Sequence, residues 1–401
     1  MSVVEKFLHY VSFDTQSDEH STSAPSTEKQ LLLAKELVKE LREIGIENAE
    51  LDPYGIVYAE IPANDGGKRH SVGLIAHMDT ASEMSGKDVH PRIVKQYEGK
   101  TIRLNEHYSM DCESYPELEA VVGDDVIVTD GTTLLGADDK AGIAIIMQTV
   151  EQLLHDDQEH GKILIAFTPD EEVGRGVVNF DLERFNPDFA YTLDGSDIRD
   201  VDYETFNAAM ATVTFHGKSI HPGSAKGRMI NAVMLAVDFA SRLPQWERPE
   251  FTEGEEGFFH LLEMHGACEK AELEYLIRDH SREKFEIKKT MLQDIATEMN
   301  DLYPECCTVE IRDQYYNMKD AMDPEMKAVK LAKKAIEECG LTPRSLPIRG
   351  GTDGAILTWR GLDTPNLGTG GGNYHGRFEF VSINKMEKMV EILSRLLQDA
   401  E

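Results

Sequence analysis

The chain has 401 residues, of which 41% are hydrophobic, and this length allows two or three domains with sizeable cores. Its formal net charge is -32, from 73 acidic and 41 basic residues. Such a field repels nucleic acid and anionic membranes and attracts cations, so we expect neither nucleic acid nor membrane as a partner.

The cysteine pattern and the amino terminus both indicate a reducing compartment. Five cysteines occur without a CxxC pair, which indicates neither a disulfide framework nor a thiolate zinc site. The stretch MSVVEKFLHYVSFDT lacks a basic region followed by an apolar core, and no apolar run approaches about 18 residues. We therefore expect a soluble, cytoplasmic protein.

The first half of the chain alternates helices with apolar strands. A helix is predicted over 27–44, where Thr27 and Gln30 fit a capping box and Gly45 ends the pattern. The runs SVGLIAHMD, GKILIAFTPDEE and DFAYTLDG are continuously apolar before their polar ends, and a helix follows the ADDK turn. Continuous apolar strands predict a mostly parallel sheet covered by helices on both faces.

The pattern changes near residue 206. AAMATVTFHG alternates like a half-exposed strand, and the elements after it are a helix, two hairpin strands, a helix and a strand. That order is β-α-β-β-α-β, the ferredoxin-like arrangement. The α/β pattern then resumes with a helix that Asp323 would cap, Pro324 would open and Gly340 would end, and a terminal helix starts near Asn384.

Two domains follow from this order of elements. An α/β domain comprises 1–205 and 318–401, and a β-α-β-β-α-β insert comprises 206–317. The insert, of roughly 100 residues, falls within the usual size range of domains.

Polar side chains stand where the predicted strands end. They are His77, Asp79, Asp170, Glu171, Glu172 and Asp194. Ligands of open α/β sheets gather beyond the carboxyl ends of the strands, so we expect these side chains to converge. The turn LLGADDKAG, with Asp138 and Asp139, belongs to the same layer, and His375 lies in the glycine-rich stretch NLGTGGGNYHGRFEF.

Each of these residues alone has an ordinary structural explanation. Asp138 and Asp139 could cap the following helix, the acids of TPDEE could face water, and the histidines could be core or surface residues. Together they are harder to explain, because carboxylates packed at one sheet edge raise each other's pKa unless cations lie between them. Histidines among carboxylates suit zinc, cobalt or manganese, so the sequence predicts a metal centre.

Six motifs carry a resemblance that covers essentially the whole chain. HMDT, LLGADDKAG, TPDEEVGRG, LDG, HPGSAKG and GGTDGA occur in this order around an inserted second domain. This pattern resembles the peptidase T family of tripeptide aminopeptidases, within the two-zinc metallopeptidase family M20 that also holds aminoacylases and carboxypeptidases. The resemblance implies a hydrolase with two Zn²⁺ ions per subunit, or Co²⁺ or Mn²⁺ in their place. It also implies short peptides, mainly tripeptides, as substrates, and a homodimer formed through the insert.

The resemblance also implies a ligand set. Asp138 would bridge the two metal ions, His77 and Asp194 would complete one site, and Glu172 and His375 would complete the other. In such families the bond between the paired aspartates is cis, which a sequence does not reveal.

Two further roles follow from the same resemblance. Glu171 would act as general base, and Asp79 would orient His77 by a hydrogen bond to its far nitrogen. Asp138 would then face the metal ions, while Asp139 would shape the turn.

The insert and the segment after it supply three substrate-binding candidates. The resemblance implies that His221, in GKSIHPGSAKG, binds the developing oxyanion, and that Arg278 and Arg349 bind the carboxylate of a peptide. Both arginines could equally form structural ion pairs, and His221 could be an ordinary loop histidine.

Three functions remain open. A metal-dependent tripeptide aminopeptidase is favoured; an N-acyl-amino-acid hydrolase or a dipeptidase would use the same site. Asp194 disfavours the N-acyl-amino-acid hydrolase or dipeptidase, because the acylase and carboxypeptidase branches more often have Glu at this position. A catalytically silent binding protein would be expected to lack a metal ligand or the general base. Here the five implied metal ligands are all present, together with Glu171 and Asp79. GxSxG, Walker and HExxH motifs are absent from the sequence.

Overall fold

The computed structural model describes residues 1–400 and divides the chain into two compact units. Unit 1 comprises Met1–Tyr203, Ala321–Leu346 and Thr352–Glu401, and unit 2 comprises Glu204–Asp320 and Pro347–Gly351. The chain therefore enters unit 2 twice, the second time for five residues only.

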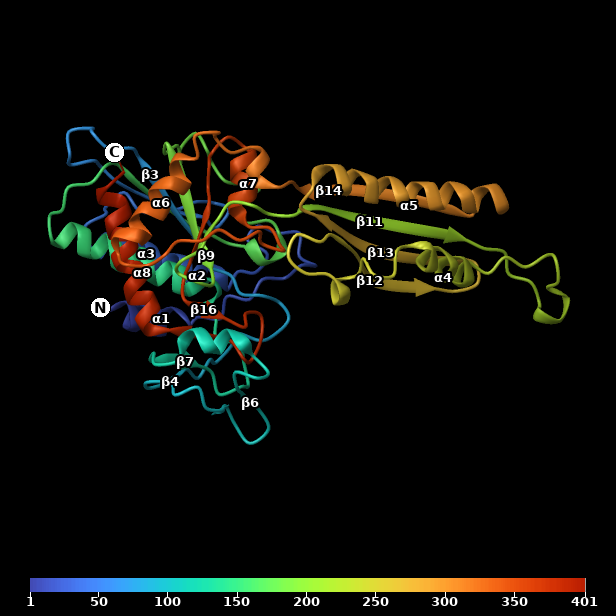
Figure 1. The fold of residues 1–401 in the computed structure, drawn as a ribbon, viewed down its shortest axis with the longest axis horizontal. Helices are drawn as coiled ribbons and strands as arrows, with labels where there is room; N and C mark the ends of the chain where they lie inside the picture. Colours follow the sequence, from blue (N-terminus) through green and yellow to red (C-terminus); the bar gives the residue numbers. More distant parts are fainter. Residues whose placement is uncertain (401) are drawn as a thin grey trace. The chain divides into compact units, whose positions relative to one another are not determined.

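A seven-stranded sheet forms the centre of unit 1 (Figure 1). Its strands, in spatial order, are β1 (Glu50–Leu51), β2 (Val57–Ile61), β8 (Ile163–Thr168), β3 (Val72–His77), β9 (Phe189–Gly195), β15 (Asn366–Gly368) and β10 (Val201–Asp202). The four strands from β8 to β15 are parallel, and the outer strands pair antiparallel. Every residue of β3 and β8 is buried, which explains their continuous apolar runs.

Helices cover both faces of this sheet, as predicted. They are α1 (Val3–Tyr10), α2 (Gln30–Glu43), α3 (Ala137–His155), α6 (Lys327–Glu338), α7 (Asp353–Trp359) and α8 (Ile383–Gln398). The helix α3 packs against β3, β9, α1 and α8, whereas α7 contributes Leu357 to a core cluster with Ile75 and Leu164. None of the helices among residues 1–400 has the length and apolarity that crossing a bilayer requires.

Unit 1 also contains short strands that the sequence does not reveal. A four-stranded sheet has the order β16 (Gly371–Gly372), β17 (Phe380–Ser382), β7 (Val126–Val128) and β4 (Arg92–Val94), and β5 (Ile102–Arg103) pairs with β6 (Ser109–Met110). Strands of two or three residues show no readable periodicity. Their importance is positional, because the antiparallel pair β16–β17 encloses residues 373–379, including His375.

Unit 2 is a four-stranded antiparallel sheet with two helices, as predicted. The strands have the order β12 (Phe258–Gly266), β13 (Lys270–Asp279), β11 (Asn207–His216) and β14 (Cys307–Tyr315), and the helices are α4 (Ala232–Arg242) and α5 (Arg282–Leu302). Burial alternates along β13 and most of β11, because one face of the sheet packs against α4 and α5.

Two helix starts differ from the prediction. The helix α2 begins at Gln30 behind Lys29, without a capping box, because the Gln30 side-chain oxygen accepts instead from the Asp170 N–H over 3.2 Å. The helix α6 begins at Lys327 rather than at Pro324, because Asp323 accepts from the Glu325 N–H in a turn outside the helix. Residues Gly45 and Gly340 follow the helix ends with positive φ, as predicted.

A buried ion-pair network joins three helices of unit 1. The Lys6 ammonium contacts Glu40 of α2 and lies 2.8 Å from Glu151 of α3, and the Tyr10 hydroxyl donates to Glu40 over 2.7 Å. We expect Glu40→Gln to lower the free energy of unfolding by about 2 kcal/mol, the usual value of a hydrogen bond to a charged group. Urea denaturation followed by circular dichroism measures this change, and an unaltered midpoint would show that Glu151 alone compensates Lys6.

Candidate metal centre

The predicted site residues of unit 1 converge at one edge of its sheet. His77 is the last residue of β3, and Asp194 lies near the end of the neighbouring parallel strand β9. Glu171 and Glu172 follow β8 in a short 3-10 turn, Glu171–Val173. Because β8, β3 and β9 are parallel neighbours, their carboxyl ends bring these side chains together.

Asp138 lies between the two histidines. Its Oδ1 atom is 2.9 Å from His77 Nε2, and its Oδ2 atom is 3.2 Å from His375 Nε2. The His77 Nε2 atom also lies 3.4 Å from Asp194 Oδ1, and His375 Nε2 lies 3.0 Å from Glu172 Oε2. Each oxygen of one carboxylate thus faces a different histidine–carboxylate pair.

The second aspartate of the ADDK turn makes different contacts. Asp139 accepts hydrogen bonds from the backbone N–H groups of His77, over 3.2 Å, and Gly142, also over 3.2 Å. The peptide bond between Asp138 and Asp139 is cis. Asp139 therefore ties the turn to β3 and to the first turn of α3, while Asp138 faces the histidines.

The carboxylate of Asp79 contacts both sides of the site. Its Oδ1 atom lies 3.3 Å from His77 Nδ1, the nitrogen that faces away from Asp138. The same carboxylate accepts from the backbone N–H groups of Glu171, over 3.0 Å, and Glu172, over 3.2 Å. Besides contacting His77, Asp79 therefore holds the turn that presents the two glutamates.

The charges of these groups perturb one another strongly. Burial raises the pKa of Glu172 to about 8 and the pKa of Asp194 to about 6, and the Asp138 charge adds to both shifts. Burial and the Asp194 charge raise the pKa of Glu171. Burial would also raise the pKa of Asp138, but hydrogen bonds from the two histidines hold it below its ordinary value.

This donor set fits divalent metal ions. Two groups of side chains have ligand atoms within 4.8 Å of one another, namely His77, Asp138 and Glu172, and His77, Glu171 and Asp194. The Glu172 Oε1 atom is buried without a hydrogen-bond partner among residues 1–400. Cations would compensate the buried carboxylates, and mixed nitrogen and oxygen donors suit zinc, cobalt or manganese.

Two carboxylates beside the centre have roles that the sequence did not reveal. Asp170 is buried and accepts from the Ser26 backbone N–H over 2.7 Å and from the Gln30 amide, so it ties the glutamate turn to α2 and belongs to neither candidate ligand group. Asp353 is also buried, and its Oδ2 atom accepts from the Thr168 hydroxyl at the end of β8 over 2.9 Å. Burial raises the pKa of Asp353 to about 7. In the sequence, Asp353 stands out only as part of the GGTDGA motif, and that motif does not indicate what the side chain does.

The three residues predicted to bind substrate belong to unit 2. His221 is exposed, and its Nδ1 atom accepts from the Gly223 N–H over 3.2 Å at the start of a short 3-10 turn. Arg278 contacts the Tyr315 hydroxyl. Arg349 donates to the carbonyls of Gly254 and Glu256 and to the Thr252 hydroxyl, so it holds the 252–256 loop.

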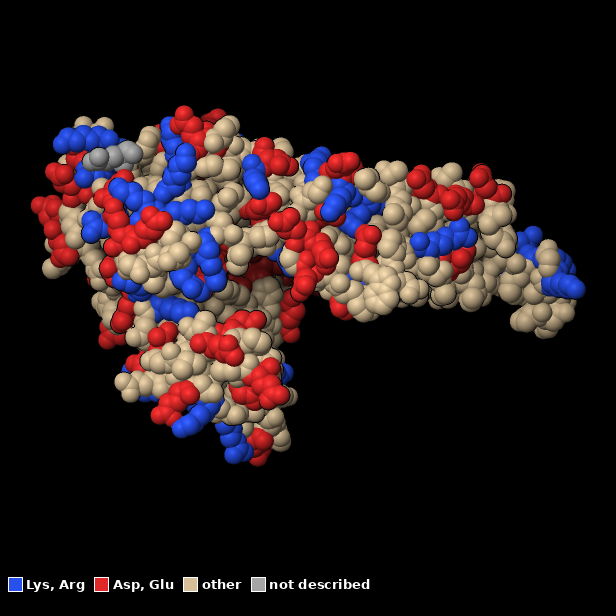
Figure 2. Space-filling view, in the orientation of Figure 1, with Lys and Arg blue, Asp and Glu red and all other residues tan. Residues whose placement is uncertain are grey.

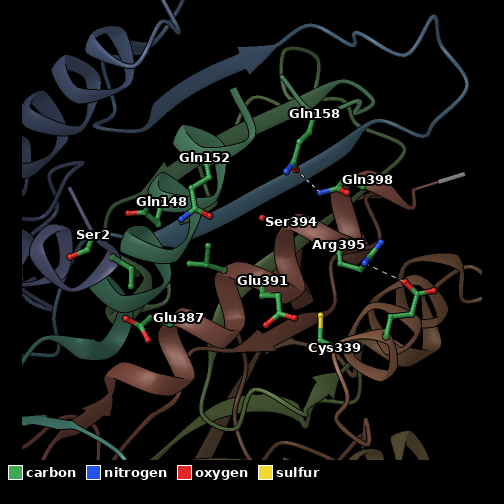
Figure 3. A pocket seen from close by; sticks show the side chains of 13 residues that line it. Ser2, Gln148, Gln152, Gln158, Cys339, Glu387, Glu391, Ser394, Arg395 and Gln398 are labelled. Atoms are coloured by element: carbon green, nitrogen blue, oxygen red, sulfur yellow. Dashed lines mark hydrogen bonds and ion pairs between the residues drawn. The ribbon is translucent and has the colours of Figure 1, made fainter. Parts of the chain in front are cut away.

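A separate groove of about 520 Å³ lies on unit 1 along α3 and α8 (Figure 3). Its lining residues are Ser2, Val3, Gln148, Gln152, Gln158, Glu338, Cys339, Glu387, Val390, Glu391, Ser394, Arg395 and Gln398. The candidate metal ligands do not line it, although α3 begins at the metal centre and extends to the groove. On the face drawn in Figure 2, basic side chains are interspersed with acidic ones.

The chain is similar to known proteins over almost its whole length. Residues 130–399 match the family described as Peptidase family M20/M25/M40. A protein of Clostridium perfringens (strain 13 / Type A) named Peptidase T is 50% identical over 398 residues, covering 99% of this chain and 98% of the relative. The structure of an aminopeptidase from Bacillus cereus ATCC 10987 matches with a TM-score of 0.77 and 22% identity, covering 99% of this chain and 98% of that one. The structure of a tripeptidase from Staphylococcus aureus subsp. aureus mu50 matches with a TM-score of 0.80 and 20% identity, covering 99% of this chain and 97% of that one.

Proposed function

The chain belongs to the M20/M25/M40 peptidase family and is a metallo-aminopeptidase, and we propose that it releases the amino-terminal residue of tripeptides at the metal centre of unit 1. The observation that carries the proposal is the Asp138 carboxylate, whose two oxygens face His77 and His375. The substrate class is supported by the 50% identical relative named Peptidase T.

Two Zn²⁺ ions, or Co²⁺ or Mn²⁺, are the proposed cofactors. Asp138 would bridge them, with His77 and Asp194 on one side and Glu172 and His375 on the other. When bound, such a pair of ions polarises a scissile carbonyl and lowers the pKa of a water molecule.

The proton transfers are assigned to Glu171. Its carboxylate would accept a proton from the attacking water as the water oxygen forms a bond to the carbonyl carbon. It would then donate this proton to the nitrogen of the leaving amine as the peptide C–N bond breaks. The Glu171 side chain lies in one of the two candidate ligand groups, with His77 and Asp194, which places it beside the proposed ions. The Asp79 carboxylate supports this role by accepting from the Glu171 backbone N–H.

Removal of metal tests the proposed cofactors. We expect dialysis against a chelator to abolish tripeptide hydrolysis, and addition of Zn²⁺, Co²⁺ or Mn²⁺ to restore it. Elemental analysis of the purified enzyme is expected to give two ions per chain. Full activity in a chain shown to be free of metal would contradict the proposal.

His221 is proposed to stabilise the developing oxyanion. We expect His221→Ala to lower kcat by about 100-fold, the usual effect of losing one oxyanion donor, with both metal ions still bound. The matched control is His216→Ala, another exposed histidine of unit 2, which should leave kcat unchanged. Loss of metal in the His221 variant would make His221 a ligand instead.

Three further assignments extend this proposal. Arg278 and Arg349 would bind the carboxylate of the peptide, and unit 2 would act as a lid and as the dimer interface. The proposed setting is the cytoplasm, where short peptides are degraded to amino acids. Light scattering on a size-exclusion column tests the homodimer, and a monomer at micromolar concentration would contradict it.

A further inference from the structure

A buried carboxylate lies directly behind the candidate bridging ligand. Glu379 is 1% exposed, and its two oxygens accept three backbone hydrogen bonds from the ADDK turn. Oε2 accepts from the N–H groups of Leu135, over 2.7 Å, and Gly136, over 2.8 Å, and Oε1 accepts from the Asp138 N–H over 3.0 Å. The backbone of the bridging aspartate is thus bound to one side chain from a distant part of the sequence.

Glu379 and His375 come from the same short hairpin. Both lie in the segment between β16 and β17, and β17 pairs with β7, whose last residue is Val128. His375 approaches the side chain of Asp138, while Glu379 holds its backbone. One hairpin therefore fixes Asp138 from two directions.

We propose that Glu379 is a positioning residue that sets where the Asp138 carboxylate lies between the two metal sites. Three N–H donors converge on it, and a carboxylate has only acceptors to offer them. A glutamine would present an NH₂ group to at least one of these donors, leaving a buried N–H unpaired. This inference rests on the metal centre proposed above and adds a residue that would not itself touch the ions or the substrate.

A merely structural role would predict a different pattern of effects. If Glu379 only stabilised the fold, its replacement would lower the melting temperature and leave the properties of the metal centre unchanged. If it positions Asp138, metal affinity and coordination change, because outer partners of metal ligands usually alter affinity by about 10- to 100-fold.

The test compares Glu379→Gln, Glu379→Asp and the control Glu40→Gln, each in the full chain. Glu40 is another buried carboxylate with several partners, in the α1–α2 network and away from the metal ligands. The readouts are Zn²⁺ affinity by calorimetry, the visible absorption spectrum of the Co²⁺-loaded enzyme, kcat and KM separately, and the melting temperature without metal.

We expect Glu379→Gln to lower Zn²⁺ affinity by about 10- to 100-fold, to alter the Co²⁺ spectrum and to reduce kcat with little change in KM. Glu379→Asp keeps the charge and should restore part of each effect, and it serves alone if the Gln variant does not fold. Glu40→Gln should lower only the melting temperature. Unchanged affinity and spectrum in the Glu379 variants would overturn the inference while leaving the proposed function intact; a wild-type chain that binds no metal would overturn both.

Discussion

Glu171→Gln is expected to reduce kcat on the order of 10³-fold while two metal ions remain bound. The amide keeps the shape of the side chain but cannot take a proton from water. The Glu171 backbone N–H still donates to Asp79, so the turn that carries Glu172 should stay in place. Steady-state kinetics with a tripeptide, together with elemental analysis of the same sample, measures both quantities.

The matched control is Glu183→Gln, an exposed carboxylate of the same unit, which should hydrolyse the tripeptide like the wild-type enzyme. Turnover by Glu171→Gln at more than a tenth of the wild-type rate would refute the assignment of the general base. Loss of metal in this variant would instead make Glu171 a ligand, as its presence in one of the two candidate ligand groups allows.

Asp138→Asn is expected to weaken metal binding more than about 100-fold, beyond the usual effect of losing an outer partner, and to abolish turnover. One of its two oxygens becomes an NH₂ group, which is not a metal ligand, so one histidine–carboxylate pair loses its shared oxygen. Competition titration with a chromophoric chelator measures both binding steps.

The adjacent aspartate provides the contrast. Asp139 accepts from two backbone N–H groups and ties the turn to β3 and α3, so Asp139→Asn should retain two bound ions with reduced stability. Equal metal loss in the two variants would show that the aspartates do not have separate roles.

The strands of unit 1 could be predicted because burial leaves a direct mark on their composition. The runs ending at His77 and Thr168 are short and apolar at consecutive positions, which is typical of a strand buried on both faces. The start of α2 could not be predicted in the same way. Gln30 fits a local capping pattern, yet its amide binds Asp170, which lies 140 residues away in the sequence. A local pattern fails when a distant partner competes for the same side chain.

The same distinction applies to the metal centre. The grouping of His77, Glu171, Glu172 and Asp194 follows from parallel neighbouring strands, a rule that needs only strand positions. The role proposed for Glu379 does not follow from strand positions in the sequence. It depends on the pairing of β17 with β7, two strands of three residues each. Residues that hold a ligand through the backbone leave no spacing pattern in the sequence.

The most direct measurement is release of the amino-terminal residue from matched di-, tri- and tetrapeptides and from an N-acetylated tripeptide, with chelator and after Zn²⁺ is restored. We predict chelator-sensitive cleavage of the free tripeptide, with little cleavage of the other substrates. Cleavage of the acetylated tripeptide in preference to the free one would contradict this result and indicate an N-acyl-amino-acid hydrolase, and preference for the dipeptide would indicate a dipeptidase. No cleavage of any substrate by a chain that holds two metal ions would contradict the enzymatic function and indicate a binding protein.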